Sequence, residues 1–430
     1  MTAPQSPSGP GTEPPSRSPG RLRRLAVDVT PLQVSPEYRR VWLANGVSFT
    51  GTQLTAVAVG IQVYDLTGSS AAVGLVGLAA LVPLVGLGLV GGALADTFER
   101  RRLALVTSSG LALLSLALVA QAALELGSVL LLYAVVALQS ALFAVDHPTR
   151  STFPPRLLPT ELLPAANALS WITSGVGATV GPLLAGVLIA GPGYTAAYAV
   201  DVVTFVAPLY SLLRLRPMPP LRGPATGRAS VREGLRLLRS RPVLLSTFVA
   251  DLLAMVFGMP RAVFPELADG ALGGGATTVG VLNASLAVGT MLAAVLSGPT
   301  GRVHRQGVGV LVAIAVWGAA MVVFGLSGVL WLACLALAVA GAADTVSAVW
   351  RQSVLQAATP DDYRGRLGGV FIVVVAGGPR LGDVRAGTAA ALVGPGVAVV
   401  GGGLAILGGV ALLAVLVPRL VRYDSRHPTA

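Results

Sequence analysis

Long apolar runs fill most of the chain and are separated by short polar connections. A helix that crosses a bilayer needs about 20 consecutive apolar residues. Residues 41–64, 103–124 and 392–418 reach this length without a charged side chain. Nine further runs are centred near Val82, Val136, Gly177, Thr204, Met255, Ala287, Ala315, Val339 and Val375. The pattern predicts an all-α membrane protein with twelve transmembrane helices.

The polar connections alternate in charge. Lysine is absent from the sequence, so the 30 lysine and arginine positions are all arginines. All but three of these arginines lie at the termini or on every second connection. The connections between them carry acids, namely Asp65, Glu125, Glu266 and Asp269. Basic loops stay on the cytoplasmic side of a membrane. We therefore expect a multi-pass protein of the cytoplasmic (inner) membrane with both termini in the cytoplasm.

Composition narrows the class of protein further. Hydrophobic residues make up 54% of the chain and charged residues 11%, with a mean hydropathy of +0.76. A soluble domain carries about 25% charged residues. The isoelectric point is near 10.9, but the positive charge is divided among loops, so we expect membrane lipids rather than nucleic acid as partners.

Several chemistries have no sequence support. A chain without lysine cannot form the phosphate-binding loop of an ATP-driven pump. The single cysteine, Cys334, cannot form an intramolecular disulfide, and the histidines, His147, His304 and His427, are scattered. No nucleophile–base pair or metal motif is evident. We therefore expect no enzyme activity, no cofactor and no bound metal.

Polar composition divides the chain into five regions. Residues 1–38 are rich in proline and are predicted to be a disordered cytoplasmic tail, not a signal peptide. Residues 39–214 and 243–418 are the predicted six-helix bundles, and residues 419–430 form a second cytoplasmic tail. Residues 215–242 are a cytoplasmic linker, in which residues 230–239 fit either a surface helix or a solvated charged segment.

The two halves repeat several features. Arg150 is followed by Pro159 and Arg351 by Pro360 at the same spacing, and each arginine is preceded by an aspartate, Asp146 or Asp344. Two similar bundles joined by a linker predict pseudo-twofold symmetry and alternating access around a midplane site.

The strongest local motif joins the second and third predicted helices. It reads Gly92-Ala-Leu-Ala-Asp96-Thr-Phe-Glu99-Arg100-Arg101-Arg102. It resembles the G-x-x-x-D-x-x-G-R-R/K loop of the major facilitator superfamily, with Glu99 in place of the second glycine. The resemblance implies that Gly92, Asp96, Arg100 and Arg101 form a gating loop that latches the two halves. A plain basic loop is the alternative interpretation.

The fifth predicted helix contains a second motif. Gly177, Gly181, Pro182 and Gly186 are similar to the G-x-x-x-G-P-x-x-G-G pattern of superfamily antiporters, with Ala185 in place of one glycine. The resemblance implies export against proton entry. Close packing of small residues explains the same pattern equally well.

Further segments, including Gly51-Thr-Gln53 and Gly378-Pro-Arg-Leu-Gly-Asp383, resemble the twelve-helix exporter branch that includes the enterobactin exporter and macrolide-type drug efflux pumps. This resemblance implies a proton-driven exporter of a small amphipathic molecule, either a drug or a siderophore. A metabolite importer and a transport-inactive sensor or scaffold are the alternatives. We expect a monomer.

Charged residues inside the predicted helices mark the coupling site, because each costs on the order of 3 kcal/mol at a helix centre by insertion scales. Asp251 is the preferred proton carrier, since its helix is expected to face the cavity and no basic residue is near it in sequence. The other candidates for binding proton or substrate are Asp344, Asp383, Arg380 and Arg261. Arg380 and Asp383 could instead form a structural pair on one helix.

Overall fold

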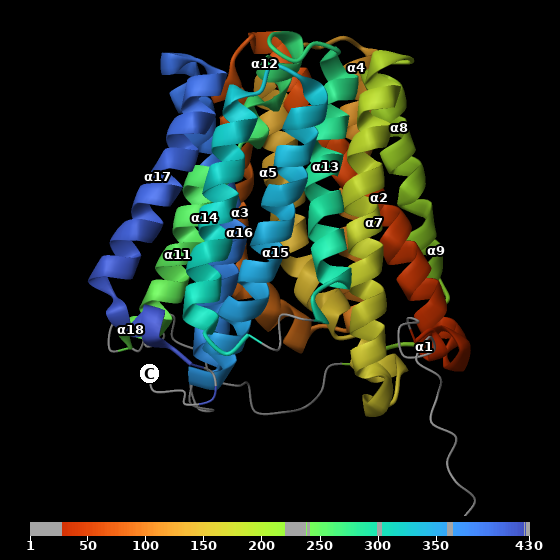
Figure 1. The fold of residues 1–430 in the computed structure, drawn as a ribbon. Coiled ribbons are helices and arrows are strands. Elements are labelled where there is room, and N and C mark those ends of the chain that lie inside the picture. The colour runs from red at the N-terminus through yellow and green to blue at the C-terminus, as the bar shows by residue number, and fades with distance from the viewer. Residues whose placement is uncertain are drawn as a thin grey trace, which may run out of the picture.

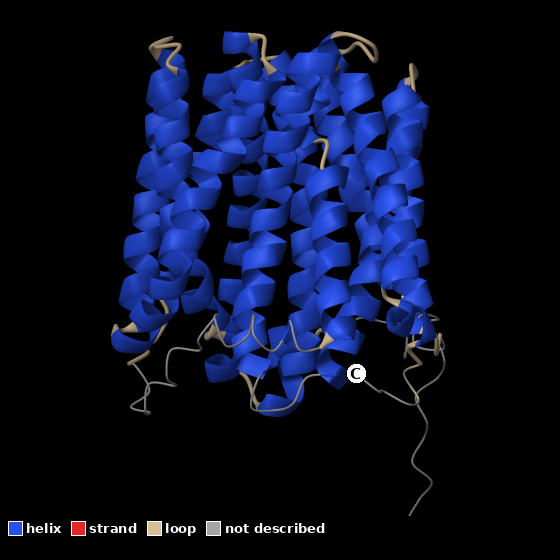
Figure 2. Cartoon of the chain, turned by 90° about the vertical axis from the view of Figure 1, so that its left-hand side faces the viewer, coloured by secondary structure: helices blue, strands red, loops and turns tan. Residues whose placement is uncertain are grey.

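The computed structural model describes residues 28–219, 238, 241–298, 303–358, 364–424 and 426. Helices run from one end of the molecule to the other, and the described residues contain no strand (Figures 1 and 2). In chain order the longer elements of the first half are α2 (Pro36–Thr67), α3 (Ser70–Thr97), α4 (Arg100–Ala123), α5 (Val129–Ser151), α7 (Leu163–Ala190), α8 (Tyr194–Thr204) and α9 (Val206–Leu213). Those of the second half are α11 (Pro242–Gly258), α13 (Gly275–Val295), α14 (Gln306–Leu326), α15 (Leu330–Ala358), α16 (Arg364–Val393) and α17 (Pro395–Leu416).

Ten helical segments within the described ranges are long and apolar enough to cross a membrane. They account for ten of the twelve predicted runs. The other two runs correspond to α2 and α16, which are helices of 32 and 30 residues. The predicted helix near Thr204 is two helices, α8 and α9, interrupted at Phe205.

Short polar sequences determine where the helices begin and end. Ser35, Ser69 and Ser128 each accept a backbone N–H bond in the first turn of α2, α3 and α5, which satisfies an otherwise unpaired donor. Gly68 has a φ of 62° and ends α2 in the left-handed conformation that glycine adopts readily. These caps set the short connection between α2 and α3.

Shorter elements lie at both ends. The arginine-rich end holds α1 (Thr30–Val34), α6 (Pro154–Leu157) and α18 (Pro418–Arg422), and the opposite end holds η2 (Arg261–Val263) and α12 (Phe264–Asp269) (Figure 1). A further turn, η1 (Thr160–Leu162), precedes α7. Helix therefore begins at Thr30, inside the segment 1–38 that the sequence predicted as a tail. The predicted surface helix at 230–239 lies largely outside the described residues.

The two halves meet along two helix pairs, α3 with α16 and α7 with α13. Near α12 the contact is backbone to backbone: a Cβ at Gly387 would collide with the carbonyl of Ser70, and one at Gly280 would lie 2.5 Å from the carbonyl of Pro182. Farther toward the arginine-rich end, a Cβ at Gly175 would make only ordinary contact, 3.4 Å from the sulfur of Met291. The seam is therefore tightest at the end remote from the arginines.

Candidate functional site

Asp251, Arg351 and Asp344 form a buried cluster in the second half. Arg351 on α15 places one terminal nitrogen 2.9 Å from Oδ1 of Asp251 on α11 and 3.4 Å from Oδ1 of Asp344. The Arg351 and Asp251 side chains are 8% and 4% exposed. Among the described residues, the other terminal nitrogen of Arg351 has no hydrogen-bond partner, and neither does the nearby buried hydroxyl of Ser347. One guanidinium thus serves two carboxylates, with bonding capacity left over.

A second buried arginine cluster lies in the first half. Arg150 on α5 donates from Nε to Asp146, from one terminal nitrogen to Asn45 and from the other to Ser108, each at 2.6 Å. Thr107 donates a hydrogen bond of 2.6 Å to the other oxygen of Asp146. All three nitrogens of this guanidinium therefore donate to an oxygen. Asp146 therefore has a structural ion-pair role.

The two clusters occupy corresponding places in the sequence. Asn45 and Asp251 each lie the same number of residues after the proline that begins their helix, Pro36 in α2 and Pro242 in α11. Arg150 and Arg351 lie near the ends of α5 and α15, the fourth long helix of each half. An amide in the first cluster thus corresponds to a carboxylate in the second.

This difference determines what each cluster can do chemically. The first cluster contains one carboxylate and one guanidinium, so its charges balance. The second contains two carboxylates and one guanidinium, so it balances only when one proton is bound. An uncompensated buried charge is strongly unfavourable. The second cluster can therefore take up and release a proton, and the two carboxyls would titrate as a coupled pair.

The remaining charged candidates lie together at the opposite end of the second half. Asp383 on α16 interacts with Arg261 and Arg380 and accepts a hydrogen bond from the backbone of Ala262. Arg261 and Ala262 belong to η2, so this group joins α16 to the break after α11. Asp383 is therefore separate from the Asp251 cluster, and Arg380 is not its sole partner.

Glu266, which follows η2, contacts the other half of the molecule. Ser70, the first residue of α3, donates a hydrogen bond to its carboxylate. Arg385, one turn beyond Arg380 on α16, donates instead to the carbonyls of Val256 and Phe257 at the end of α11, at 2.9 and 3.1 Å. The charges at this end fasten the break after α11 and close the seam with α3.

The gating-loop motif contacts the end of its own half. Arg101 donates to the carbonyls of Leu212 and Leu213, the last residues of α9, at 2.8 and 3.0 Å. Arg100 is buried, and its backbone N–H donates to Met218. Gly92 and Asp96 lie near the end of α3, and their side-chain surroundings lie outside the part of the structure that is described.

Glu99, which replaces the glycine of the superfamily pattern, has a definite place. One carboxylate oxygen caps α4 by accepting from the N–H of Arg102 at 3.2 Å, and the other accepts from the N–H of Met218 at 2.9 Å. The carboxylate thus ties the start of the linker to the start of α4. These contacts of Glu99, Arg100 and Arg101 fix the exit of the first half.

The glycine–proline motif of α7, the fifth predicted helix, packs against two different helices. A Cβ at Gly181 would lie 2.6 Å from the carbonyl of Thr50, and one at Gly177 would lie 2.6 Å from the ring of Phe49, both on α2. Gly186 faces the backbone of Ala276 on α13, in the other half. The Pro182 carbonyl lies beside Gly280 on the same helix. The motif therefore belongs to the seam between the halves as well as to the packing of the first half.

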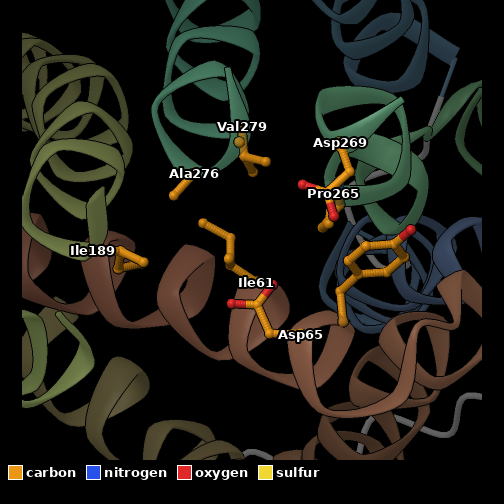
Figure 3. Close-up of a pocket in the computed structure, with 9 residues that line it drawn as sticks. Ile61, Asp65, Ile189, Pro265, Asp269, Ala276 and Val279 are labelled. Carbon is orange, nitrogen blue, oxygen red and sulfur yellow. The ribbon is translucent and has the colours of Figure 1, made fainter. Parts of the chain in front are cut away.

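A pocket of about 270 Å³ lies at the end of the seam opposite the arginines. Ile61 and Asp65 line it from α2, Ile189 from α7, Asp269 from α12, and Ala276 and Val279 from α13 (Figure 3). Tyr194 donates a hydrogen bond to the Asp65 carboxylate. Apolar side chains and two carboxylates thus share one small cavity between the halves.

Sequence reasoning selected Asp251 and Asp344 but missed Arg351 and Asn45. No basic residue lies close to Asp251 in the sequence. Arg351 is brought to Asp251 by the packing of α11 near α15. The repeated arginine–proline spacing, Arg150 to Pro159 and Arg351 to Pro360, and the matching helix prolines carried the signal. Overlaying the two halves by those residues would have placed Asn45 opposite Asp251.

Comparisons with known proteins agree with this architecture. Residues 27–428 match the sequence model of a protein family in the major facilitator superfamily. This family is described as transmembrane secretion effector. The enterobactin exporter of Citrobacter koseri is 29% identical over 400 residues, covering 92% of this chain and 95% of that protein. The enterobactin exporter of Escherichia coli O1:K1 / APEC is 28% identical over 402 residues, with the same coverage.

Solved structures show the same fold at much lower identity. The crystal structure of the nucleoside transporter NupG superposes with a TM-score of 0.73 at 12% identity, covering 90% of this chain and 100% of that chain. The arrangement of α2 to α17 is therefore that of major facilitator transporters.

Proposed function

Because the chain belongs to the transmembrane secretion effector family of the major facilitator superfamily, we propose that it exports a small amphipathic molecule in exchange for protons. The exporter relatives match nearly the whole chain. The observation that carries proton coupling is the second arginine cluster, whose two carboxylates share one nitrogen of Arg351. In this proposal α2 and α16 also cross the membrane, which gives twelve spans in two pseudo-symmetric bundles.

The proton site is the Asp251–Asp344 pair. When the pair holds one proton the cluster is neutral, and when it loses that proton a negative charge is left beside an arginine with unused donor capacity. A transporter can use this difference if each charge state favours a different access state. Proton uptake from one side and release to the other would then drive the cargo the opposite way.

The membrane orientation follows from the arginines. We place the arginine-rich end in the cytoplasm and the pocket at Asp65 and Asp269 on the outer side of the cytoplasmic membrane. The tight seam near Gly387 and Gly280 then closes the outer side. The described arrangement fits a state that receives cargo from the cytoplasm.

The cargo is inferred from the relatives and from the outer pocket. The matched relatives are named for export of enterobactin, a siderophore. Ile61, Ile189 and Val279 give the pocket an apolar wall, while Asp65 and Asp269 accept hydrogen bonds. A siderophore-like molecule with apolar and hydroxyl groups suits this lining, and in our proposal the pocket lies on its exit path.

Everted membrane vesicles test this function directly. Vesicles that contain the protein should take up a siderophore or amphipathic dye when acidified inside, and a protonophore should stop the uptake. The Asp251→Asn variant should not respond to the proton gradient. Uptake that is unchanged by the protonophore would overturn proton coupling. Accumulation of the cargo by intact cells that produce the protein would overturn export.

A further inference from the structure

Asp201 is a buried carboxylate that the proton site does not use. It lies on α8, is 1% exposed, and packs between α2 and α4 in the first half. Within the described part of the chain its partners are hydroxyl groups, and no arginine or histidine pairs with it. A buried carboxylate without a cationic partner is unstable unless a proton or cation neutralises it.

The hydroxyls around Asp201 are arranged as acceptors as well as donors. Ser115 on α4 donates to Oδ2 at 2.7 Å. Thr204 donates its single hydroxyl hydrogen to the backbone oxygen of Asp201 at 2.7 Å, while its oxygen lies 3.4 Å from Oδ1. This hydroxyl has one hydrogen for two acceptors, so its contact with Oδ1 is a weak, shared hydrogen bond that leaves Oδ1 incompletely bonded.

A third oxygen points to the same place. Thr55 on α2 is 3% exposed and its hydroxyl is directed at the Asp201 carboxylate, yet it takes part in no well-aligned hydrogen bond with any described residue. Gly51, one turn earlier on α2, leaves room for this group, because a Cβ there would collide with both Thr204 Oγ1 and Asp201 Oδ1. The backbone of α2 therefore lies directly against the oxygens of Thr204 and Asp201.

The local backbone also fits an ion site. The helix is interrupted at Phe205, directly after Thr204, so Asp201 and Thr204 lie in the last turn of α8. Transporters commonly bind sodium where a membrane helix is discontinuous and its C-terminal end offers oxygen ligands. Phe205 keeps helical backbone angles and donates to the Asp201 carbonyl, so the oxygens available here are those of the Asp201 and Thr204 side chains.

We propose that Asp201, Thr204 and Thr55 form a sodium-ion site inside the first half. A hard cation of this size binds oxygen at about 2.4 Å, which places adjacent octahedral ligands about 3.4 Å apart. The Thr204–Asp201 separation has this value. One carboxylate balances one positive charge, which favours a monovalent cation over calcium. Protonation of Asp201 is the alternative, because a protonated carboxyl could donate to the Thr55 oxygen, and the sodium titration separates the two.

The test measures sodium binding to the purified full-length protein in detergent. Melting temperature is followed against sodium chloride at constant ionic strength and pH, with choline chloride as replacement, and radioactive sodium binding is measured in parallel. We expect a saturable rise in Tm with sodium alone. Asp201→Asn should abolish both signals, and Thr204→Val should weaken sodium affinity at least about tenfold.

Matched variants separate this site from folding and from proton coupling. Thr55→Ser keeps the hydroxyl and should keep sodium binding, whereas Thr55→Val should lose most of it, so the pair carries the test if Asp201→Asn does not fold. Asp251→Asn should leave sodium binding intact, whether or not proton-driven export is confirmed. Equal responses to sodium and choline, or a Tm that follows pH alone, would overturn the proposal.

Discussion

The Arg150 and Arg351 clusters are built on corresponding helices, yet they differ in how completely their arginine is bonded. Arg150 has a partner for each outward nitrogen, whereas Arg351 shares one nitrogen between two carboxylates. One chemical source of the difference is an amide, because Asn45 in the first half stands where Asp251 stands in the second. The remaining aspartates also differ in position, since Asp146 lies four residues before Arg150 and Asp344 lies seven before Arg351. In the proposed mechanism, the repeated fold keeps one copy of the cluster for structure and uses the other for proton exchange.

Replacing Asp251 with asparagine should have the largest effect, because it gives the second cluster the composition of the first. We expect Asp251→Asn to abolish proton-driven export, since the variant cluster balances its charge without binding a proton. Export is measured in everted vesicles, and Tm confirms folding. Asp424→Asn, at an exposed pair with Arg426, is the matched control and should export normally. Unimpaired export by Asp251→Asn would remove the pair from the mechanism.

The two arginines should differ in their contribution to stability. Arg150→Gln loses hydrogen bonds to Asp146, Asn45 and Ser108, and should lower the free energy of unfolding by about 3 kcal/mol or more. Arg351→Gln should cost less, because Asp251 and Asp344 can take up protons when their cation is removed. Thermal unfolding of both variants at pH 6 checks the order. A larger loss for Arg351→Gln would contradict the comparison.

The reverse exchange should create a proton site in the first half. Asn45→Asp adds a second carboxylate beside Arg150, so the cluster gains a negative charge that only a proton can balance. We expect the Tm of this variant to fall as pH rises from about 5 to 8, relative to the unmodified protein, because deprotonation leaves a buried uncompensated charge. An identical pH profile for the two proteins would show that the halves are not interchangeable in this way.

The smallest contrast concerns two serines. Ser108 accepts a hydrogen bond from Arg150, so Ser108→Ala should reduce the free energy of unfolding by about 1–3 kcal/mol. Ser347, beside Arg351, is buried and has no hydrogen-bond partner among the described residues. Ser347→Ala should therefore be neutral or slightly stabilising. Denaturation midpoints of the two variants measure the contrast, and equal losses would argue against it.

Much of this architecture was predictable because membrane helices leave a strong signal. The apolar runs and the alternation of arginines located the helices, and the superfamily loop at Gly92–Arg102 identified the fold. The pairing of Asp251 with Arg351 was not predictable from local sequence, because it depends on helices that are far apart in the chain. The break at Phe205 was also missed, since residues 194–213 read as one long apolar run with a single charged residue, Asp201.

The candidate site was predicted in part for a related reason. Asp251 and Asp344 stood out because charges are costly in a bilayer. Asn45 and Thr55 are neutral, so the same reasoning could not find them. The contacts of Glu99 were not predicted, because the superfamily motif has a glycine at this position. In the structure Glu99 caps α4 and also accepts a hydrogen bond from the backbone of Met218 in the linker.

The glycine seam between α3 and α16 has a consequence for how such an exporter can change over generations. No long side chain interlocks the two backbones at Gly387 and Ser70, so a single added methyl group there is enough to push the halves apart. The resting preference for one side of the membrane can thus shift without any change in cargo contacts. Variants selected for faster or slower efflux should accumulate along this seam, far from any residue that touches the exported molecule.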